Sequence, residues 1–191
     1  ALVTGIITMM FNWTMLKYVG EEGVAAVTII MYVLMFASSL YTGYAYGVAP
    51  MISFYYGEQN QEKLKELITL SMKVIAVISL LTVAASYFLT RPLVTVFARP
   101  DNPVYDLAVT GNRICTIALL FIGFNIFASG MFTALSNGVV SAVLAFSRSF
   151  VFMLIAMLVL PAFWGVNGVW LATPAAELMA VILYACMFMK Y

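Results

Sequence analysis

Long apolar stretches, broken only briefly by polar residues, constrain this chain more than any other feature of its sequence. Of its 191 residues, 64% are hydrophobic and 9% are charged, whereas an average soluble domain is about 25% charged. A soluble protein of this size needs polar side chains to cover its surface, while lipid accepts apolar ones. The composition therefore predicts an integral membrane protein.

Six of the apolar runs are long enough to cross a bilayer, which takes about 20 mostly apolar residues in a helix. They cover residues 2–18, 24–50, 63–89, 105–135, 139–160 and 169–190. The longest connector carries prolines and the apolar patch Leu93–Ala98, which is too short to span a membrane. Trp164, Trp170 and Tyr191 lie near helix ends, where interfacial anchors are expected. We therefore predict an all-α membrane protein in which residues 1–191 form a single six-helix unit.

Charge and residue usage argue against several classes of function. The net charge of +1 indicates neither a nucleic-acid partner nor steering of charged substrates. Histidine, the commonest metal ligand and general base, is absent. Cys115 and Cys186 lie inside apolar runs and are interpreted as packing residues. We expect no enzyme, no metal site and no cofactor.

Three ionisable residues lie deep in the predicted spans, where a charge is costly. Arg148 is about ten residues into the fifth run and Glu177 about nine into the sixth, so at 1.5 Å per residue they reach similar depths from opposite faces. The two are therefore predicted to pair. Glu177 either exchanges a proton or cation during transport or forms a static strut with Arg148. Arg113, in the fourth run, can extend to the nearer face.

Two amides and two prolines complete the candidate residues. Asn12 and Asn125 lie within spans, either as hydrogen-bond partners between helices or as cavity-lining groups for a polar ligand. Pro50 and Pro174 leave backbone carbonyls without helical donors. Broken transporter helices use such carbonyls to bind ions or to hinge, although kinks are also ordinary in membrane helices.

Two stretches of the sequence carry distinctive motifs. The first is Gly47–Gly57, with Pro50, Ser53 and the closing glycine, followed by a charged helix start. The second runs from Ala145-Phe-Ser-Arg148 through an apolar stretch to the segment 165–174, which reads GVNGVWLATP. Together, over almost the whole chain, they resemble the C-terminal half of multidrug and toxic compound extrusion (MATE) transporters. Tyr56 departs from the family pattern, which often has Asn there.

The resemblance implies one lobe of a twelve-helix, pseudo-two-fold secondary antiporter that exports organic cations in exchange for Na⁺ or H⁺. Because the chain begins almost inside its first apolar run, we expect the N-terminal lobe to be missing from it and to be its partner. The resemblance also implies the cytoplasmic membrane, with both ends of this segment cytoplasmic. Positive charges alone barely favour either orientation.

The coupling site departs from the family. Some members carry acidic residues in the first and fourth helices of this lobe, whereas here the first run has none and the fourth has only Asp106 at its mouth. Asn12 is the nearest polar replacement. Coupling is therefore expected either in the missing lobe or partly at Glu177. Two other readings stay open: a flippase for lipid-linked intermediates from the same superfamily, and a membrane-embedded assembly subunit or enzyme.

Overall fold

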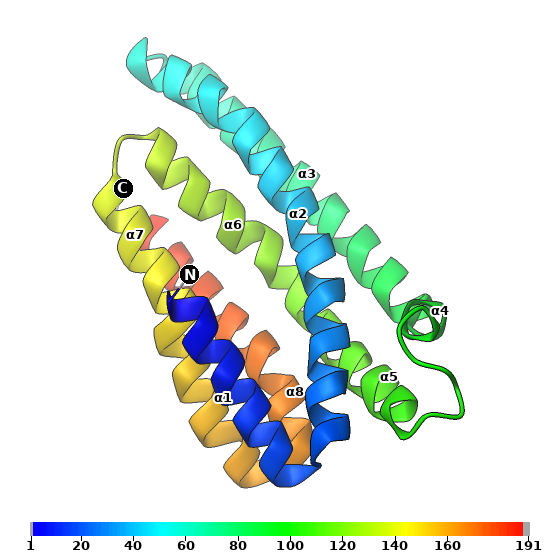
Figure 1. The fold of residues 1–191 in the computed structure, drawn as a ribbon. Coiled ribbons are helices and arrows are strands. Elements are labelled where there is room, and N and C mark those ends of the chain that lie inside the picture. Colours follow the sequence, from blue (N-terminus) through cyan, green and yellow to red (C-terminus); the bar gives the residue numbers. More distant parts are fainter. Residues whose placement is uncertain (1, 189–191) are drawn as a thin grey trace.

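The computed structural model describes residues 2–188, which form helices joined by short turns (Figure 1). The elements are α1 (Leu2–Tyr18), α2 (Glu21–Gly57), α3 (Gln61–Phe88), α4 (Thr90–Thr95), α5 (Pro103–Cys115), η1 (Thr116–Ala118), α6 (Leu119–Ala134), α7 (Gly138–Phe146), η2 (Ser147–Phe152) and α8 (Met153–Phe188).

The described residues make six passes along the molecule. Helices α5, η1 and α6 follow one another without a turn, as do α7, η2 and the first part of α8. Within α8 the chain reverses at Gly165, where φ is 55° and ψ is −130°. Four continuous helical segments are long and apolar enough to cross a membrane, and the longest, Gly138–Phe188, holds two passes because of this reversal.

Local sequence explains where several helices begin and turn. Asparagine side chains cap three helices: Asn60 accepts from the Lys63 N–H at 3.1 Å, Asn102 from the Val104 N–H at 2.9 Å and Asn137 from the Val140 N–H at 3.3 Å. The turn between α1 and α2 uses Gly20, whose φ of 96° suits glycine. Capped ends and tight turns place successive helices side by side.

The helices extend beyond several predicted ranges. Helix α2 begins at Glu21 and continues through Pro50 to Gly57, and the fifth pass continues through Pro161 until Gly165. The chain therefore breaks at Gly165 and not at either proline. Proline is tolerated within membrane helices because neighbouring groups satisfy the freed carbonyls. Near the end of the fifth pass, the Tyr18 hydroxyl donates to the Pro161 carbonyl at 3.2 Å. Residues 189–191, which include the end of the predicted sixth span and Tyr191, lie outside the described residues.

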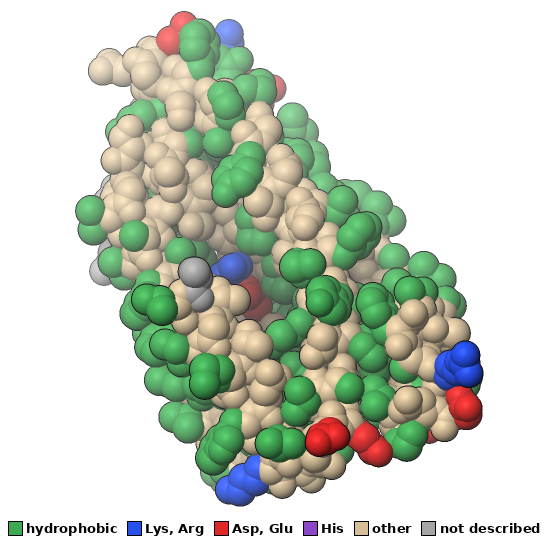
Figure 2. Space-filling model, viewed as in Figure 1, with side chains coloured by type: hydrophobic (Ala, Val, Ile, Leu, Met, Phe, Trp, Pro, Cys, Tyr) green, Lys and Arg blue, Asp and Glu red, His purple; other side chains and the backbone are tan. Residues whose placement is uncertain are grey.

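Small and aromatic residues build the interior, while large apolar side chains also cover the outside. Trp170, Tyr41 and Phe127 are almost fully buried. The Tyr41 hydroxyl donates to the Leu119 carbonyl at 3.1 Å and also contacts Thr82 Oγ1, tying α2 to α3 and α6. Phe36, Phe88 and Phe163 are more than 70% exposed. In Figure 2 apolar side chains lie along the length of the molecule and most charges at its two ends, as expected when lipid surrounds the middle.

The reversal between the last two passes gives a test of the fold. A Cβ on Gly168 would lie 2.2 Å from the Leu160 carbonyl oxygen, so Gly168→Ala forces the two backbones apart. We expect this substitution to cost about 1–3 kcal/mol and to lower the melting temperature of the protein in detergent.

Gly43→Ala is the matched control, because a Cβ on Gly43 meets nothing within 4 Å. Equal melting temperatures for the two variants would contradict the close packing at the Gly165 turn.

Candidate functional site

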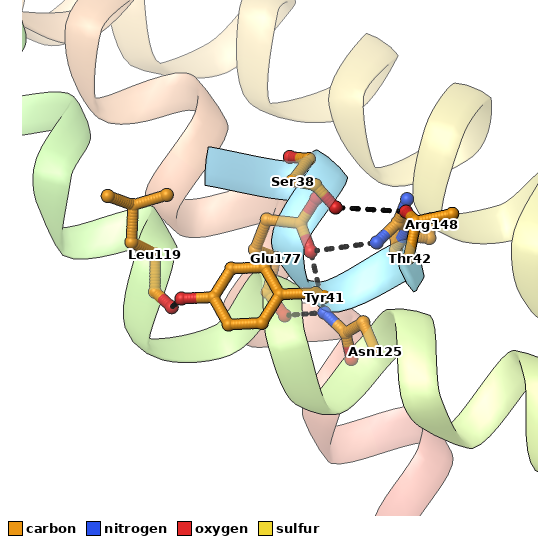
Figure 3. A network of polar contacts seen from close by, with 7 residues as sticks. All are labelled: Ser38, Tyr41, Thr42, Leu119, Asn125, Arg148 and Glu177. Atoms are coloured by element: carbon orange, nitrogen blue, oxygen red, sulfur yellow. Dashed lines mark hydrogen bonds and ion pairs between the residues drawn. The ribbon is translucent and has the colours of Figure 1, made fainter. Parts of the chain in front are cut away.

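An ion pair lies at the centre of the lobe, away from the charges at its ends. Arg148 Nη1 lies 3.5 Å from Glu177 Oε2, so the structure brings together the two residues whose equal depths predicted a pair. Asn125 Nδ2 donates to the same Oε2 at 2.7 Å and to the Glu177 carbonyl at 2.9 Å. Figure 3 shows the three side chains converging from three different helices.

Each of the three residues is placed by a distinct local feature. Arg148 lies in η2, a π-helical segment inside the fifth pass, and such segments occur frequently at functional sites. Asn125 lies in the middle of α6 and is 1% exposed. Glu177 follows Pro174 by about one turn in α8 and is 8% exposed. The Glu177 carboxylate therefore lies where water has little access, whereas Arg148 is partly exposed.

The two prolines play different local roles. Pro174 has no N–H for the Trp170 carbonyl, and the Cys115 thiol donates to that carbonyl at 3.3 Å instead. The thiol is thus occupied within the core, as expected of a packing residue. Pro50 is exposed in α2 and borders a cavity described below. Helix α2 stays helical through Pro50, so neither proline breaks its helix.

A cavity of about 640 Å³ adjoins the ion pair between α2, α6, α7 and α8. Arg148 and Asn125 both border it. Its remaining polar lining consists of hydroxyl groups from three elements, α2, α6 and α8, and its other walls are apolar. The hydroxyl-bearing residues are Thr42, Tyr46, Ser53, Ser129, Thr133 and Tyr184.

Two sequence candidates lie elsewhere. Asn12 is half-buried in α1 and faces a separate shallow hollow with Trp13 and Glu21. Arg113 is exposed on α5, with its guanidinium 5.5 Å from the centre of the Tyr87 ring. Neither residue lines the cavity beside Arg148. Of the five polar candidates, the structure brings together Arg148, Glu177 and Asn125.

Sequence reasoning missed the hydroxyl groups around the cavity, although their spacing carries a signal. Ser129 follows Asn125 by four residues and Tyr184 follows Glu177 by seven, so each shares a helix face with a candidate. Thr42 and Ser53 have no such relation to an ionisable residue in their own helix, and only the packing of α2 against α6 brings them to the site.

Within residues 2–188 no group of three or more histidine, cysteine or acidic side chains is placed to hold a metal ion. The carboxylate of Glu177 is neutralised by Arg148 and held by Asn125. Charged side chains buried beside a cavity within a membrane protein are typical of sites that recognise a ligand or couple to an ion.

Several solved structures of membrane transporters are similar to this one. An outward-facing multidrug resistance MATE family transporter of the MOP superfamily matches with a TM-score of 0.90 and 22% identity, over 99% of this chain and 43% of that chain. An inward-facing one matches at 0.91 and 22%, over 99% and 44%. The bent form of the Vibrio cholerae MATE transporter VcmN matches at 0.89 and 18%, over 99% and 43%. This chain thus spans less than half the length of each.

A comparison with curated protein sequences gives no match. The family model MatE matches residues 2–160, which is most of the chain. Together with six apolar passes around a buried ion pair, this match shows that the chain belongs to the MatE family of membrane transporters.

Proposed function

We propose that this chain is one lobe of a secondary antiporter that exports organic cations, including drugs, in exchange for Na⁺ or H⁺. Its partner is a second six-helix lobe, and the transported molecule passes through the space between the two. The observation that best supports this proposal is the match to less than half of each solved transporter, over nearly all of this chain.

The likeness to two transport states supports a simple mechanism. The chain matches the outward-facing structure with a TM-score of 0.90 and the inward-facing one with 0.91. A lobe that fits both states equally well does not need to refold during the cycle. Alternating access is then a rocking of one rigid lobe against the other, as in other transporters built from repeats.

The orientation in the cytoplasmic membrane is part of the proposal. The turn between α2 and α3 and the connection between α4 and α5 lie at opposite ends of the molecule (Figure 1). We place the former in the cytoplasm with both ends of the segment, and the latter outside.

Transport requires both lobes. Reconstituted with its partner lobe, the protein should move ethidium when a Na⁺ or H⁺ gradient is imposed, measured by fluorescence in vesicles. The lobe alone should move none, because half a cavity cannot close around a substrate. Gradient-driven uptake by the lobe alone, with crosslinking that detects only monomers, would reject the two-lobe mechanism.

Orientation can be tested by cysteine labelling. In a background where Cys115 and the exposed Cys186 are replaced by Ala, single cysteines are introduced as Asn60→Cys and Asn102→Cys. In intact cells an impermeant thiol reagent should label the second and spare the first. Lysed cells provide the control, in which both sites should react. Labelling of the first variant in intact cells would invert the proposed topology.

Substitutions in the Arg148–Glu177 pair distinguish a structural role of the pair from a role in ion coupling. If the pair is a static strut, Glu177→Gln leaves a guanidinium unpaired and should lower the melting temperature by on the order of 5 °C. The double variant Glu177→Gln, Arg148→Gln should recover much of that loss. If Glu177 carries the coupling charge, Glu177→Gln should fold normally and lose ion-dependent efflux, without rescue by the second change. We expect the structural outcome.

Glu62→Gln, an exposed change at the start of α3, is the matched control and should alter neither property. A Glu177→Gln protein with unchanged stability and unchanged efflux would contradict both roles.

A further inference from the structure

A second groove, of about 460 Å³, lies between α3, α6 and the last part of α8. It uses a different face of α6 from the cavity beside the ion pair. Phe124, Phe127 and Met131 line the groove, whereas Ser129 and Thr133 line the cavity. The groove therefore lies on the far side of α6, and a partner lobe that closes over the cavity leaves the groove facing lipid.

The groove runs inward from the end of the molecule that carries the turn between α2 and α3. The Ser53 hydroxyl, near the end of α2, donates to the Ala134 carbonyl at 3.0 Å, and the Phe132 and Phe188 rings lie 6.3 Å apart. These contacts gather the start of α3 and the ends of α6 and α8 at one end. From there the groove reaches Asn125, in the middle of α6. Most of its walls are aliphatic or aromatic, which suits a hydrocarbon chain.

Two lysines of α3 lie along the edge of this groove. Lys65 is four residues before Thr69 and Lys73 is four residues after it, and Thr69 lines the groove. Residues four apart share a helix face, so both lysines follow the stripe of α3 that borders the groove. Both are exposed. Neither ammonium has an ion-pair or hydrogen-bond partner within residues 2–188, where Arg148–Glu177 is the one ion pair.

Lys73 lies within the apolar part of α3 and faces lipid. The last acidic residue of α3, Glu66, is seven residues nearer the end, which is about 10 Å along the axis. A charge at such a depth is costly unless its long side chain reaches the interface or a partner. Because Cα–Cβ bonds tilt toward the N-terminus of a helix, the Lys73 ammonium is favoured to extend toward Thr69 and the membrane surface.

A phosphate beside Thr69 would be within reach of both lysines. Each lysine is four residues from Thr69, or about 6 Å along the helix axis, a distance that a lysine side chain can cover. The groove begins at the same level of α3. A ligand that joins a phosphate to a hydrocarbon chain therefore matches the two lysines and the groove together.

A free anion and a neutral lipid match this surface less well. Inorganic phosphate or a soluble phosphate ester would use the lysines and leave the groove empty. Phosphatidylcholine carries its own cation beside its phosphate, and that cation would lie near the lysines. An anionic phospholipid has the phosphate and the chain without the opposing cation, and basic side chains near a membrane surface attract such lipids.

We propose that this groove binds an anionic phospholipid from the leaflet on the side of the α2–α3 turn, with the phosphate held by Lys65 and Lys73 and one acyl chain in the groove. Asn125 borders both the groove and the cavity beside the ion pair, and it donates to Glu177 Oε2 at 2.7 Å. The bound chain thus packs against the residue that holds the buried carboxylate. The inference goes beyond the proposed export and does not depend on it.

Native mass spectrometry of the purified two-lobe protein in neutral detergent tests the headgroup. It compares phosphatidylglycerol and phosphatidylcholine with the same acyl chains, through the dissociation constant of the first bound lipid. We expect phosphatidylglycerol to bind about tenfold more tightly, and Lys65→Gln, Lys73→Gln to remove this preference, because each lysine adds attraction for the anionic headgroup. Lys63→Gln is the matched control. Lys63 lies in the same first turns of α3 but over the Tyr55 ring, at 5.7 Å, so the preference should persist.

A substitution that fills the groove tests the acyl chain. Ala185 is exposed and lines the groove, so Ala185→Phe should fold normally and weaken phosphatidylglycerol binding about fivefold or more by occupying the space of the chain. Val77→Phe, at an exposed position of α3 outside the groove, should leave the affinity unchanged. Melting temperatures in lipid-free detergent, expected to match the wild type for every variant, verify the fold.

Several outcomes would overturn the proposal. They are equal affinity for the two lipids, equal loss in Lys63→Gln and in the double variant, and unchanged phosphatidylglycerol binding in Ala185→Phe. Glycerol 3-phosphate, the headgroup chemistry without a chain, should not displace phosphatidylglycerol at equal concentration. Displacement by it would assign the lysines to a soluble anion and reject the lipid site.

Discussion

Hydrocarbon offers no hydrogen-bond partners, and this constraint shapes the whole lobe. A polar group buried there is costly unless the protein itself supplies a partner. Helices satisfy their own backbones, and side chains then pair between helices. Asn112 donates to the Thr90 hydroxyl at 3.1 Å, and the Ser86 and Thr116 hydroxyls lie 2.8 Å apart, so this cluster ties α3 and α4 to α5 and η1. Such contacts hold the lobe together in a solvent that does not drive apolar side chains inward.

The same constraint makes the Arg148–Glu177 pair the most costly feature of the interior. Two charges near the middle of the lobe are tolerated because each neutralises the other and Asn125 adds a hydrogen bond to the carboxylate. A leucine pair of similar size would pack there at lower cost in free energy. The pair also adjoins the cavity, since Arg148 both contacts Glu177 and lines the open space.

Sequence alone accounts for much of this structure, and the reasons for its failures are physical. Apolar runs predict helices because lipid permits little else, and the depths of Arg148 and Glu177 predict their contact because consecutive passes are antiparallel. Helix continuity through Pro50 and Pro161 was not predicted, because it depends on neighbouring groups that satisfy the freed carbonyls, and these are set by packing between helices. The π-helical segment around Arg148 and the cavity beside it depend on how α2, α6 and α8 pack, which single-helix patterns do not encode.

The geometry of a site inside a rigid lobe stays constant while the lobe moves. If the lobe keeps one shape while it rocks, the distances within the Arg148, Glu177 and Asn125 cluster change little during the cycle. A ligand held only by these groups would then bind equally well in both states, and a ligand with equal affinity for two states does not shift the equilibrium between them.

A difference in affinity between the two states must therefore come from access to water or from contacts with the facing lobe. The cavity is partly open and Arg148 is partly exposed, so closure of a second lobe over this face would remove water from the pair and strengthen its contacts. On the proposed two-lobe mechanism, motion between the lobes would therefore act on the ion pair inside one of them.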